Sequence, residues 1–477
     1  MLPAEDVLTY EFTTQDKTAC AIVYADGVVN KQLLGDLVAR PLSRADLSQL
    51  QDGEKAAALE KALLFPELKN KTFFTDCVKE ILDGNSLLLV DGIAAGFIVG
   101  AKLIPSRAVI EPPTDIAVKG PREGFIEDIK TNMALIRKRL KTPNLRFETV
   151  RVGKQSDTAV TVCWLHGIAD EKVKQDISDQ LSKLQIDILP DSSYIAALLS
   201  PRKHSVFQTM GTTEKPDIFA AKLSEGRIGI LVDGSPIALT APFLLSENLQ
   251  SSEDYFISPF MATTFRFLRC IALFVSILLP AFYVSAQLFK MQLLPLGLML
   301  TIASSVRELP LSPNLEMFVV LLLLEILKEA SIRMPKYVGM SLSVVGALVL
   351  GETAVSAGFL STPAIIIVAF SGICLYTVPN FVETGSLLRW LFLLVAGSVG
   401  PFGIVLLFAF LLYYTLSSDA FGAPLLAPFS PLVTHDLRDS LVKYDMLSLK
   451  KRPKIFRTKN KTRLRPPTEK TKNGKGD

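Results

Sequence analysis

The sequence predicts an α/β cytosolic region of two related subdomains, followed by an α-helical transmembrane domain with about four full spans and additional short or re-entrant helices. Three observations lead to this fold class: a fall in the density of charged residues near residue 265, a strand–turn–helix signature that occurs twice before it, and long apolar stretches after it. The expected regions are a first α/β subdomain over 1–104, a second over 105–264, a transmembrane domain over 265–418, and a cytosolic C-terminal segment with a basic disordered tail over 419–477.

The density of charged residues divides the chain. Charged side chains recur every few positions up to about Thr264, whereas twelve Asp, Glu, Lys and Arg residues remain between Cys270 and Leu416. A domain folded in water keeps a charged and polar surface, so this long charge-poor region is not an ordinary globular one. The first residues show no basic patch followed by an apolar run. We therefore expect no cleavable signal peptide and a soluble part that begins in the cytosol.

The soluble half contains an internal duplication. An apolar strand, a turn with glycine and an amphipathic helix occur around Gly27 and again around Gly167, 140 residues later. Each copy ends in an Asp-Gly pair between two apolar strands, at Gly92 and at Gly234, which are 142 residues apart. Asp-Gly suits the positive φ angles of a tight hairpin turn. Because the spacing is held over a whole subdomain, we infer two related α/β units.

Motifs for catalysis, a cofactor or a metal are missing from the soluble half. The five cysteines lie far apart and lack the paired spacing of zinc sites, so buried free thiols are the simpler interpretation. The stretch Gly120–Gly124 lacks the spacing of a phosphate-binding loop. Neither His166 nor His204 lies in a catalytic motif. We therefore predict that the protein is not an enzyme and uses no cofactor or metal.

Three stretches are long and apolar enough for full membrane spans, which need about 20 mainly apolar residues. They are Phe267–Phe289, Phe359–Val378 and Leu387–Leu416. The third is too long for one straight span, and we expect it to tilt or kink at Gly400 and Pro401. Shorter apolar pieces lie at Leu293–Val306, Met317–Leu327 and Val338–Leu350. These fit re-entrant segments, helices in the membrane interface, or spans shielded by neighbouring subunits.

Basic residues set the expected orientation. Arg266 and Arg269 precede the first span, and the tail from Lys450 to Lys475 has twelve Lys or Arg residues and the single acidic residue Glu469. Positive charge marks the cytoplasmic flanks of spans, so both chain ends should lie in the cytosol and the number of crossings should be even. We interpret the basic tail as an element that attracts anionic lipids. Nothing else in the sequence indicates nucleic acid as a partner.

Charged side chains inside the apolar region are candidate functional residues, because they are costly in a membrane. The intramembrane charge candidates are Glu308, Glu316 and Glu325. Glu325 stands one turn from Lys328, and Glu329 and Arg333 are spaced i to i+4. Pairing within one helix is therefore an alternative to an ion-conducting role.

The segment from Val338 to Gly358 has the pattern of a pore helix. It is rich in small residues, which allow helices to approach closely. One helical stripe holds the pore-lining candidates Ser341, Val345, Leu348, Glu352 and Val355. In a ring of subunits this stripe would form apolar constrictions and one ring of carboxylates. A tightly packed helix without a pore explains the same pattern.

A series of segments runs in order along nearly the whole chain in a pattern typical of one family. The segments are Glu111–Asp115, Arg122–Phe125, Asn132–Leu140, Ser246–Phe256, Arg266–Arg269, Leu279–Val284, Arg307–Pro310, Glu325–Pro335 and Ser343–Gly351. Together they closely resemble the A subunit of the GerA family of spore germinant receptors. The sequence departs from that family at Leu321 and Ser356, where the family often has Glu.

The resemblance implies a channel-forming receptor subunit in the inner membrane of dormant spores. It implies two partners, a transporter-like B subunit that binds the nutrient and a lipoprotein C subunit, and self-association, expected as a pentamer. The main interpretation is a nutrient-gated ion channel subunit that triggers germination through cation release. The alternative is a non-conducting membrane scaffold or signalling adaptor within the receptor complex.

Overall fold

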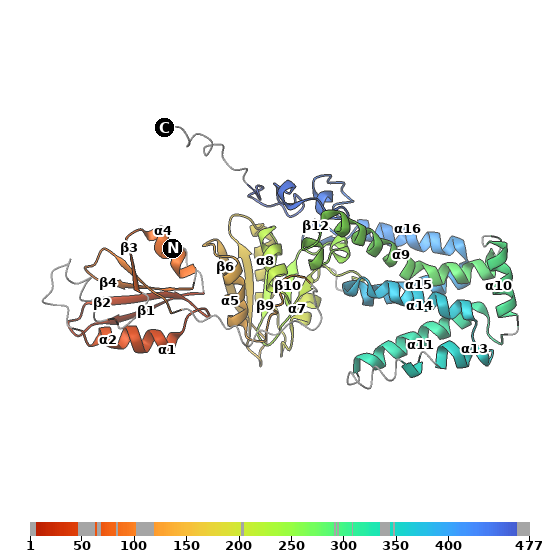
Figure 1. Ribbon diagram of the computed structural model, residues 1–477, viewed down its shortest axis with the longest axis horizontal. Helices are drawn as coiled ribbons and strands as arrows, with labels where there is room; N and C mark the ends of the chain where they lie inside the picture. Colours follow the sequence, from red (N-terminus) through yellow and green to blue (C-terminus); the bar gives the residue numbers. More distant parts are fainter. Residues whose placement is uncertain are drawn as a thin grey trace.

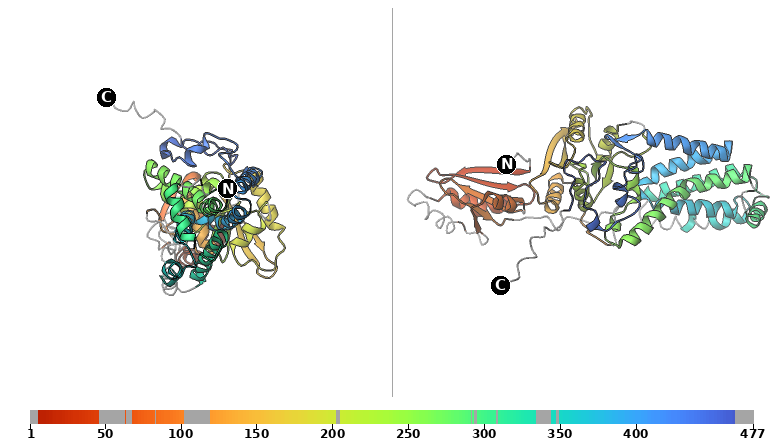
Figure 2. Two further views of the ribbon diagram at one scale, coloured as in Figure 1. Left: turned by 90° about the vertical axis from the view of Figure 1, so that its right-hand side faces the viewer. Right: turned by 90° about the horizontal axis from the view of Figure 1, so that it is seen from above.

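The computed structural model describes residues 6–45, 63, 68–82, 84–101, 119–201, 205–290, 292, 295–307, 309–333, 344–346 and 349–464. They form a first α/β subdomain, a second α/β subdomain and a helical bundle in a row (Figure 1). The C-terminal segment, residues 417–464, lies back against the second subdomain, and Figure 2 shows the same elongated arrangement from two further directions.

The first subdomain is built on a five-stranded antiparallel sheet with the strand order β1-β2-β4-β5-β3. Its elements are β1 Val7–Thr13, β2 Ala19–Ala25, α1 Lys31–Leu34, the π-helix η1 Gly35–Ala39, α2 Arg40–Ser43, β3 Leu68–Lys71, α4 Phe74–Leu82, β4 Ser86–Val90 and β5 Gly96–Val99. Successive strand residues point to opposite faces. Leu88 and Phe97 therefore join the core under α1 and α2, whereas Leu87 and Ile98 pack against α4.

The second subdomain repeats this design, with a sheet in the order β6-β7-β9-β10-β8. Its elements are α5 Ile129–Arg139, β6 Leu145–Val152, β7 Thr158–Leu165, α6 Glu171–Ser182, α7 Ser192–Leu198, β8 Gly211–Thr213, α8 Pro216–Ser224, β9 Ile228–Val232 and β10 Ala238–Ala241. Ile230 on β9 faces a core with residues of α6 and α7. Its neighbour Leu231 faces a second core with residues of α5 and α8. Helices thus cover both faces of each sheet.

The predicted duplication is confirmed at the level of strand register. Each β-strand of one sheet has its counterpart at the same place in the other. In the pair β2 and β4, Cys20 lies opposite Val90, and in the pair β7 and β9, Val160 lies opposite Val232. These are the offsets of 140 and 142 residues that the turn glycines show. All four turn glycines have positive φ: Gly27, Gly92, Gly167 and Gly234.

The helical bundle follows two 3₁₀ turns, η2 Leu245–Leu249 and η3 Ser252–Tyr255. Its elements are α9 Pro259–Phe289, α10 Leu296–Val306, α11 Pro313–Arg333, the π-helix η5 Val349–Thr353, α13 Ala354–Ser356, α14 Thr362–Tyr376, η6 Pro379–Phe381, α15 Val382–Val399 and α16 Pro401–Leu416. In the described part of the chain, two helices are long and apolar enough to cross a membrane, Pro259–Phe289 and Pro379–Val399. The prediction of four full spans is therefore not confirmed. At about 1.5 Å per residue, α14 and α16 reach only about 22–24 Å.

The apolar stretch Leu387–Leu416 was predicted to form one kinked helix, and this is wrong. The chain breaks at Gly400, where φ is 73°, and α15 and α16 pack side by side (Figure 1). Glycine reaches this backbone conformation readily, and Pro401 begins the next helix because its missing N–H is not needed there. A Cβ on Gly400 would lie 2.8 Å from the Phe289 ring, so the turn is also packed tightly.

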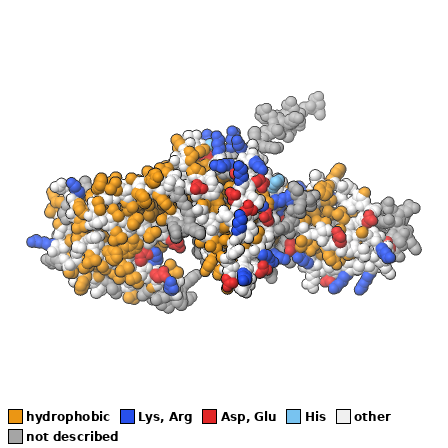
Figure 3. Space-filling view, turned by 180° about the vertical axis from the view of Figure 1, so that it is seen from behind, with side chains coloured by type: hydrophobic (Ala, Val, Ile, Leu, Met, Phe, Trp, Pro, Cys, Tyr) orange, Lys and Arg blue, Asp and Glu red, His pale blue; other side chains and the backbone are white. Residues whose placement is uncertain are grey.

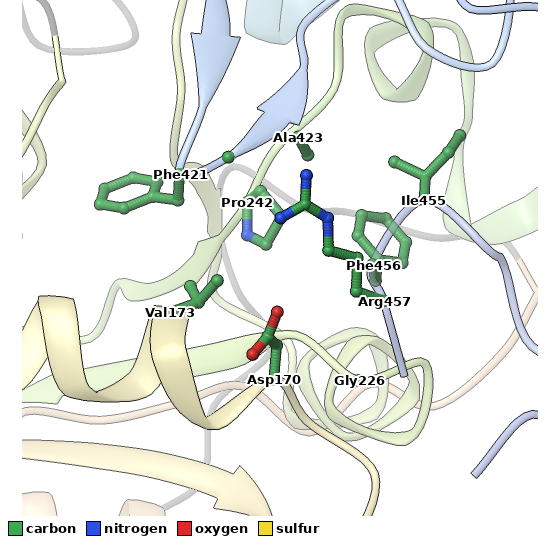
Figure 4. A pocket seen from close by; sticks show the side chains of 10 residues that line it. Asp170, Val173, Gly226, Pro242, Phe421, Ala423, Ile455, Phe456 and Arg457 are labelled. Atoms are coloured by element: carbon green, nitrogen blue, oxygen red, sulfur yellow. The ribbon is translucent and has the colours of Figure 1, made fainter. Parts of the chain in front are cut away.

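The basic tail is folded up to residue 464, which corrects the expectation of a disordered tail from Lys450. Phe456 is buried with Leu244, and Arg452 Nε donates to the Ser224 carbonyl at 2.7 Å. Figure 4 shows Phe456 and Arg457 beside Pro242 and the start of α6 at Asp170. Apolar side chains interleaved with the basic ones anchor this part. Residues 465–477 lie outside the described residues. The remaining elements of the C-terminal segment are β11 Asp419–Ala420, β12 Ala423–Pro424, η7 Asp436–Asp439 and η8 Met446–Ser448.

Candidate functional site

Glu325 is the centre of a polar network inside the helical bundle. On α11, its carboxylate pairs with Lys328 one turn away, as predicted, and with Arg389 of α15 at 2.7 Å. It also accepts a hydrogen bond from Ser386. Arg389 is 1% exposed and donates to Ser371 of α14, whose hydroxyl donates to a carbonyl of α9 at 2.7 Å. The sequence indicated the pairing within α11, but not the partner on α15.

Glu316 is fully buried near the far end of the bundle. Its Oε1 accepts the backbone N–H of Ser361 at 2.5 Å, and Ser361 in turn caps the first turn of α14. A carboxylate near the start of α11 and the start of α14 is favoured by the positive ends of both helices. Glu316 therefore fixes two helices to each other. The third charge candidate, Glu308, lies outside the described residues.

The pore-lining candidates fall partly within the described chain. Val345 is 55% exposed, Glu352 is exposed and Val355 is partly buried. Glu352 belongs to the π-helix η5 rather than to a regular α-helix. The side chains of Val345 and Glu352 thus lie on the outside of the bundle. Ser341 and Leu348 lie outside the described residues.

A buried charge cluster, which we call the junction, connects the bundle to the α/β region. It consists of Asp254 of η3, Arg266 and Arg269 of α9, and Asp439 and Lys443 of the C-terminal segment. Arg266 and Asp254 are both fully buried, with Nε and Oδ2 3.0 Å apart. Arg269 reaches the same carboxylate at 2.9 Å, and Arg266 also contacts Asp439 at 3.2 Å.

The electrostatics of the junction favour the ionised carboxylate. Burial raises the pKa of Asp254, but hydrogen bonds from Arg269 and Arg266 outweigh it and hold the pKa below the usual value. Lys443 lies 3.4 Å from Asp439 and 3.9 Å from the centre of the Tyr255 ring. Three separate parts of the chain are therefore held by one set of ion pairs.

A second cluster, the α8 cluster, lies on the α/β side of the junction. It consists of Lys222, Glu225, Arg227, Glu247 and Arg463. Arg227 pairs with Glu247 and with Glu225, the latter at 3.2 Å, and stacks on Phe456 of the C-terminal segment. Burial raises the pKa of Glu225 and lowers the pKa of Lys222.

Sequence reasoning missed both clusters as sites. It noted Arg266 and Arg269 only as flanks of a span, and Glu247 and Asp254 only as part of a segment that resembles a family. The Ser-x-x-Asp spacing at Ser251 was a usable signal, because Ser251 and Asp254 form a capping box. Asp439 lies 173 residues beyond Arg266, and no local pattern predicts that contact.

These features define a class of protein: a duplicated α/β unit that is attached, through buried ion pairs, to an apolar helical bundle. Within this class, the profile of the family described as Bacillus/Clostridium GerA spore germination protein matches residues 2–455. The chain belongs to this family, and the resemblance noted from its motifs is confirmed.

Relatives match along almost the whole chain. Spore germination protein KA of Bacillus subtilis is 33% identical over 451 residues, which cover 94% of this chain and 83% of that protein. Spore germination protein GerLA of Bacillus cereus is 32% identical over 451 residues, which cover 94% and 91%. The crystal structure of the N-terminal domain of the A subunit of the Bacillus megaterium spore germinant receptor GerK3 is 30% identical, with a TM-score of 0.40, over 51% of this chain and 90% of that one.

Proposed function

We propose that this chain is the A subunit of a nutrient-sensing spore germinant receptor, and that several copies assemble into a cation channel in the spore inner membrane. Family membership supports the role in germination. The observation that carries the channel proposal is the contrast between the inside and the outside of the bundle. Inside, the Glu325 network joins four helices with its charges paired; outside, Val345 and Glu352 are exposed.

An ion path between copies fits this contrast better than a path through one copy. Opening a path inside the bundle would break the Arg389–Glu325 pair, and breaking a buried pair typically costs about 3–5 kcal/mol. An exposed stripe around Glu352 costs nothing to present to a neighbouring subunit. A carboxylate repeated around a symmetric ring would attract cations, and the flanking valines would narrow the path. A pentamer is the expected ring.

The surface of the bundle supports a membrane location. Figure 3 shows hydrophobic side chains over most of the visible bundle surface, and charged ones over the middle of the molecule. In Figure 1, α9 begins and α16 ends at the same end of the bundle, beside the second subdomain. This arrangement supports cytosolic positions for both the α/β region and the C-terminal segment. Exposed basic residues such as Lys451, Lys454 and Lys459 remain available to anionic lipid headgroups.

The junction is the element through which we propose that the receptor is coupled. A transporter-like B subunit that binds the nutrient and a lipoprotein C subunit are the proposed partners. Ligand-driven change in a neighbour acts on this subunit only if it favours one of two arrangements of the bundle. The protein is proposed to conduct ions rather than to catalyse a reaction.

The test is to purify the full chain, measure its oligomeric mass by native mass spectrometry, and record currents in planar bilayers. We expect a discrete oligomer whose closed-state leak increases in Val345→Ala and Val355→Ala. Leu322→Ala, at another exposed apolar position of the bundle, is the matched control and should leave the leak unchanged. An oligomer that stays silent alone and with ligand-loaded B and C subunits would favour the scaffold alternative.

A further inference from the structure

A cavity of about 1000 Å³ lies between the second subdomain and the base of the bundle. One wall is the face of α8 that carries Asp217, Ala221 and Glu225; the others come from η2, η3 and the Thr377–Asn380 turn between α14 and α15. Arg269 of α9 and Arg463 of the C-terminal segment complete the lining. Its volume is at the upper end for small-molecule pockets, which hold about 300–1000 Å³.

Polar atoms in the lining lack partners within the described part of the chain. Asn248 is 8% exposed, and its Oδ1 accepts no hydrogen bond. Asp217 Oδ1 is likewise buried without a donor. Arg227 is 5% exposed, and its Nε donates to no acceptor. A buried polar atom without a partner costs about 1–3 kcal/mol, so such atoms mark places where a partner is expected.

The charges in the lining favour a positively charged partner. Lys222 and Arg227 are paired with Glu247, Arg463 lies 3.8 Å from Glu225, and Arg269 is held by Asp254. The cationic side chains of the lining are thus already neutralised, whereas two acceptor oxygens, on Asp217 and Asn248, are not satisfied. Aromatic side chains in the lining offer faces to an ammonium group and to its methylene groups; these are Phe243, Tyr255 and Phe256.

We propose that this cavity binds a small organic ammonium ligand, with Asp217 and Asn248 accepting its N–H donors. The aromatic rings cover its carbon chain, and Arg227 Nε donates to an oxygen of the ligand or of a water beside it. A ligand here touches the second subdomain, the α14–α15 turn and α9 at once. It therefore reports the chemistry of the cytosolic side to the helices of the bundle, at a place separate from the exposed Glu352 stripe.

The test uses the purified full chain in detergent and isothermal titration calorimetry with a matched pair of four-carbon probes at equal ionic strength, putrescine and succinate. We expect putrescine to bind saturably and succinate not to bind. Asp217→Asn should weaken putrescine binding about tenfold or more, as the loss of a hydrogen bond to a charged group predicts. Ala221→Phe, which fills the cavity from an exposed position on α8, should abolish it.

The matched control is Asp176→Asn, an exposed carboxylate of α6 that is not part of the cavity lining, and it should bind putrescine like the wild type. Wild-type protein that takes up no putrescine at millimolar concentration would overturn the proposal. So would binding that is unchanged in both Asp217→Asn and Ala221→Phe, or binding of succinate in place of putrescine. The readout is binding, so it does not depend on whether the protein conducts ions.

Discussion

Replacing Asp254 by Asn removes the carboxylate that Arg266 and Arg269 share. The change is nearly isosteric, so its main effect is to leave the fully buried Arg266 without its closest counter-charge. Removing one partner of a buried ion pair costs about 3–5 kcal/mol. For a cooperative unit of about 150–250 residues, each kcal/mol lowers Tm by about 2–4 °C. The bundle with its C-terminal segment falls in this size range, so we expect Tm to drop by about 6–20 °C.

The pH dependence provides a separate check. Because the fold lowers the pKa of Asp254, its contribution is present above the unfolded pKa of about 3.9 and is lost as pH falls through the lower folded value. The Tm difference between wild type and Asp254→Asn should therefore stay constant from about pH 5 to pH 8 and shrink below about pH 4.

The assay is thermal unfolding of the full chain in detergent, followed by tryptophan fluorescence. The matched control is Asp36→Asn, whose carboxylate forms an exposed ion pair with Arg40 at 2.6 Å. Exposed pairs contribute about 0–1 kcal/mol, so this control should shift Tm little. If Asp254→Asn shifted Tm no more than Asp36→Asn, the junction would not hold the bundle as we describe.

Three further predictions follow from the same structure. Arg389→Met should destabilise the bundle by about 3 kcal/mol because it leaves Glu325 with Lys328 alone, and adding Glu325→Gln should recover part of the loss in a thermal unfolding series. Burial raises the pKa of Glu225, so its contribution favours the folded state at low pH and is lost as pH rises; Glu225→Gln should flatten the dependence of Tm on pH above about 4.5. Gly400→Ala should destabilise the α15–α16 turn by about 1–3 kcal/mol, because φ is 73° and the Phe289 ring lies where the methyl group would go. Gly297→Ala on α10, where a Cβ meets nothing within 4 Å, should leave Tm equal or higher, and equal effects in the two variants would contradict this reading.

The features that sequence patterns predicted are those encoded locally. Gly27 and Gly167 stand at equivalent turns because each turn requires positive φ, and the Asp-Gly hairpins have the same origin. The pairing of Glu325 with Lys328, and of Glu329 with Arg333, follows from helix geometry alone.

The features that sequence patterns missed depend on distant parts of the chain. Gly400 and Pro401 marked the break in the last apolar stretch, but local sequence does not distinguish a kink from a full turn. That choice depends on the packing of Gly400 against Phe289, more than a hundred residues earlier. Asp439 meets Arg266, and Phe456 meets Leu244, only after the C-terminal segment folds back. A run of basic residues looked like a free tail because its few apolar anchors carry little weight in composition.

The most direct test of the central claim is the ion selectivity of the assembled protein in planar bilayers under a salt gradient. If Glu352 forms a ring between copies, the reversal potential of the wild type should indicate cation preference. Glu352→Gln should weaken this preference, and Glu352→Lys should weaken it further or reverse it. Glu329→Gln, which removes an exposed carboxylate elsewhere on the bundle, should change nothing. Selectivity that is identical in all four proteins, or a stable oligomer that never conducts with its partners present, would contradict the account.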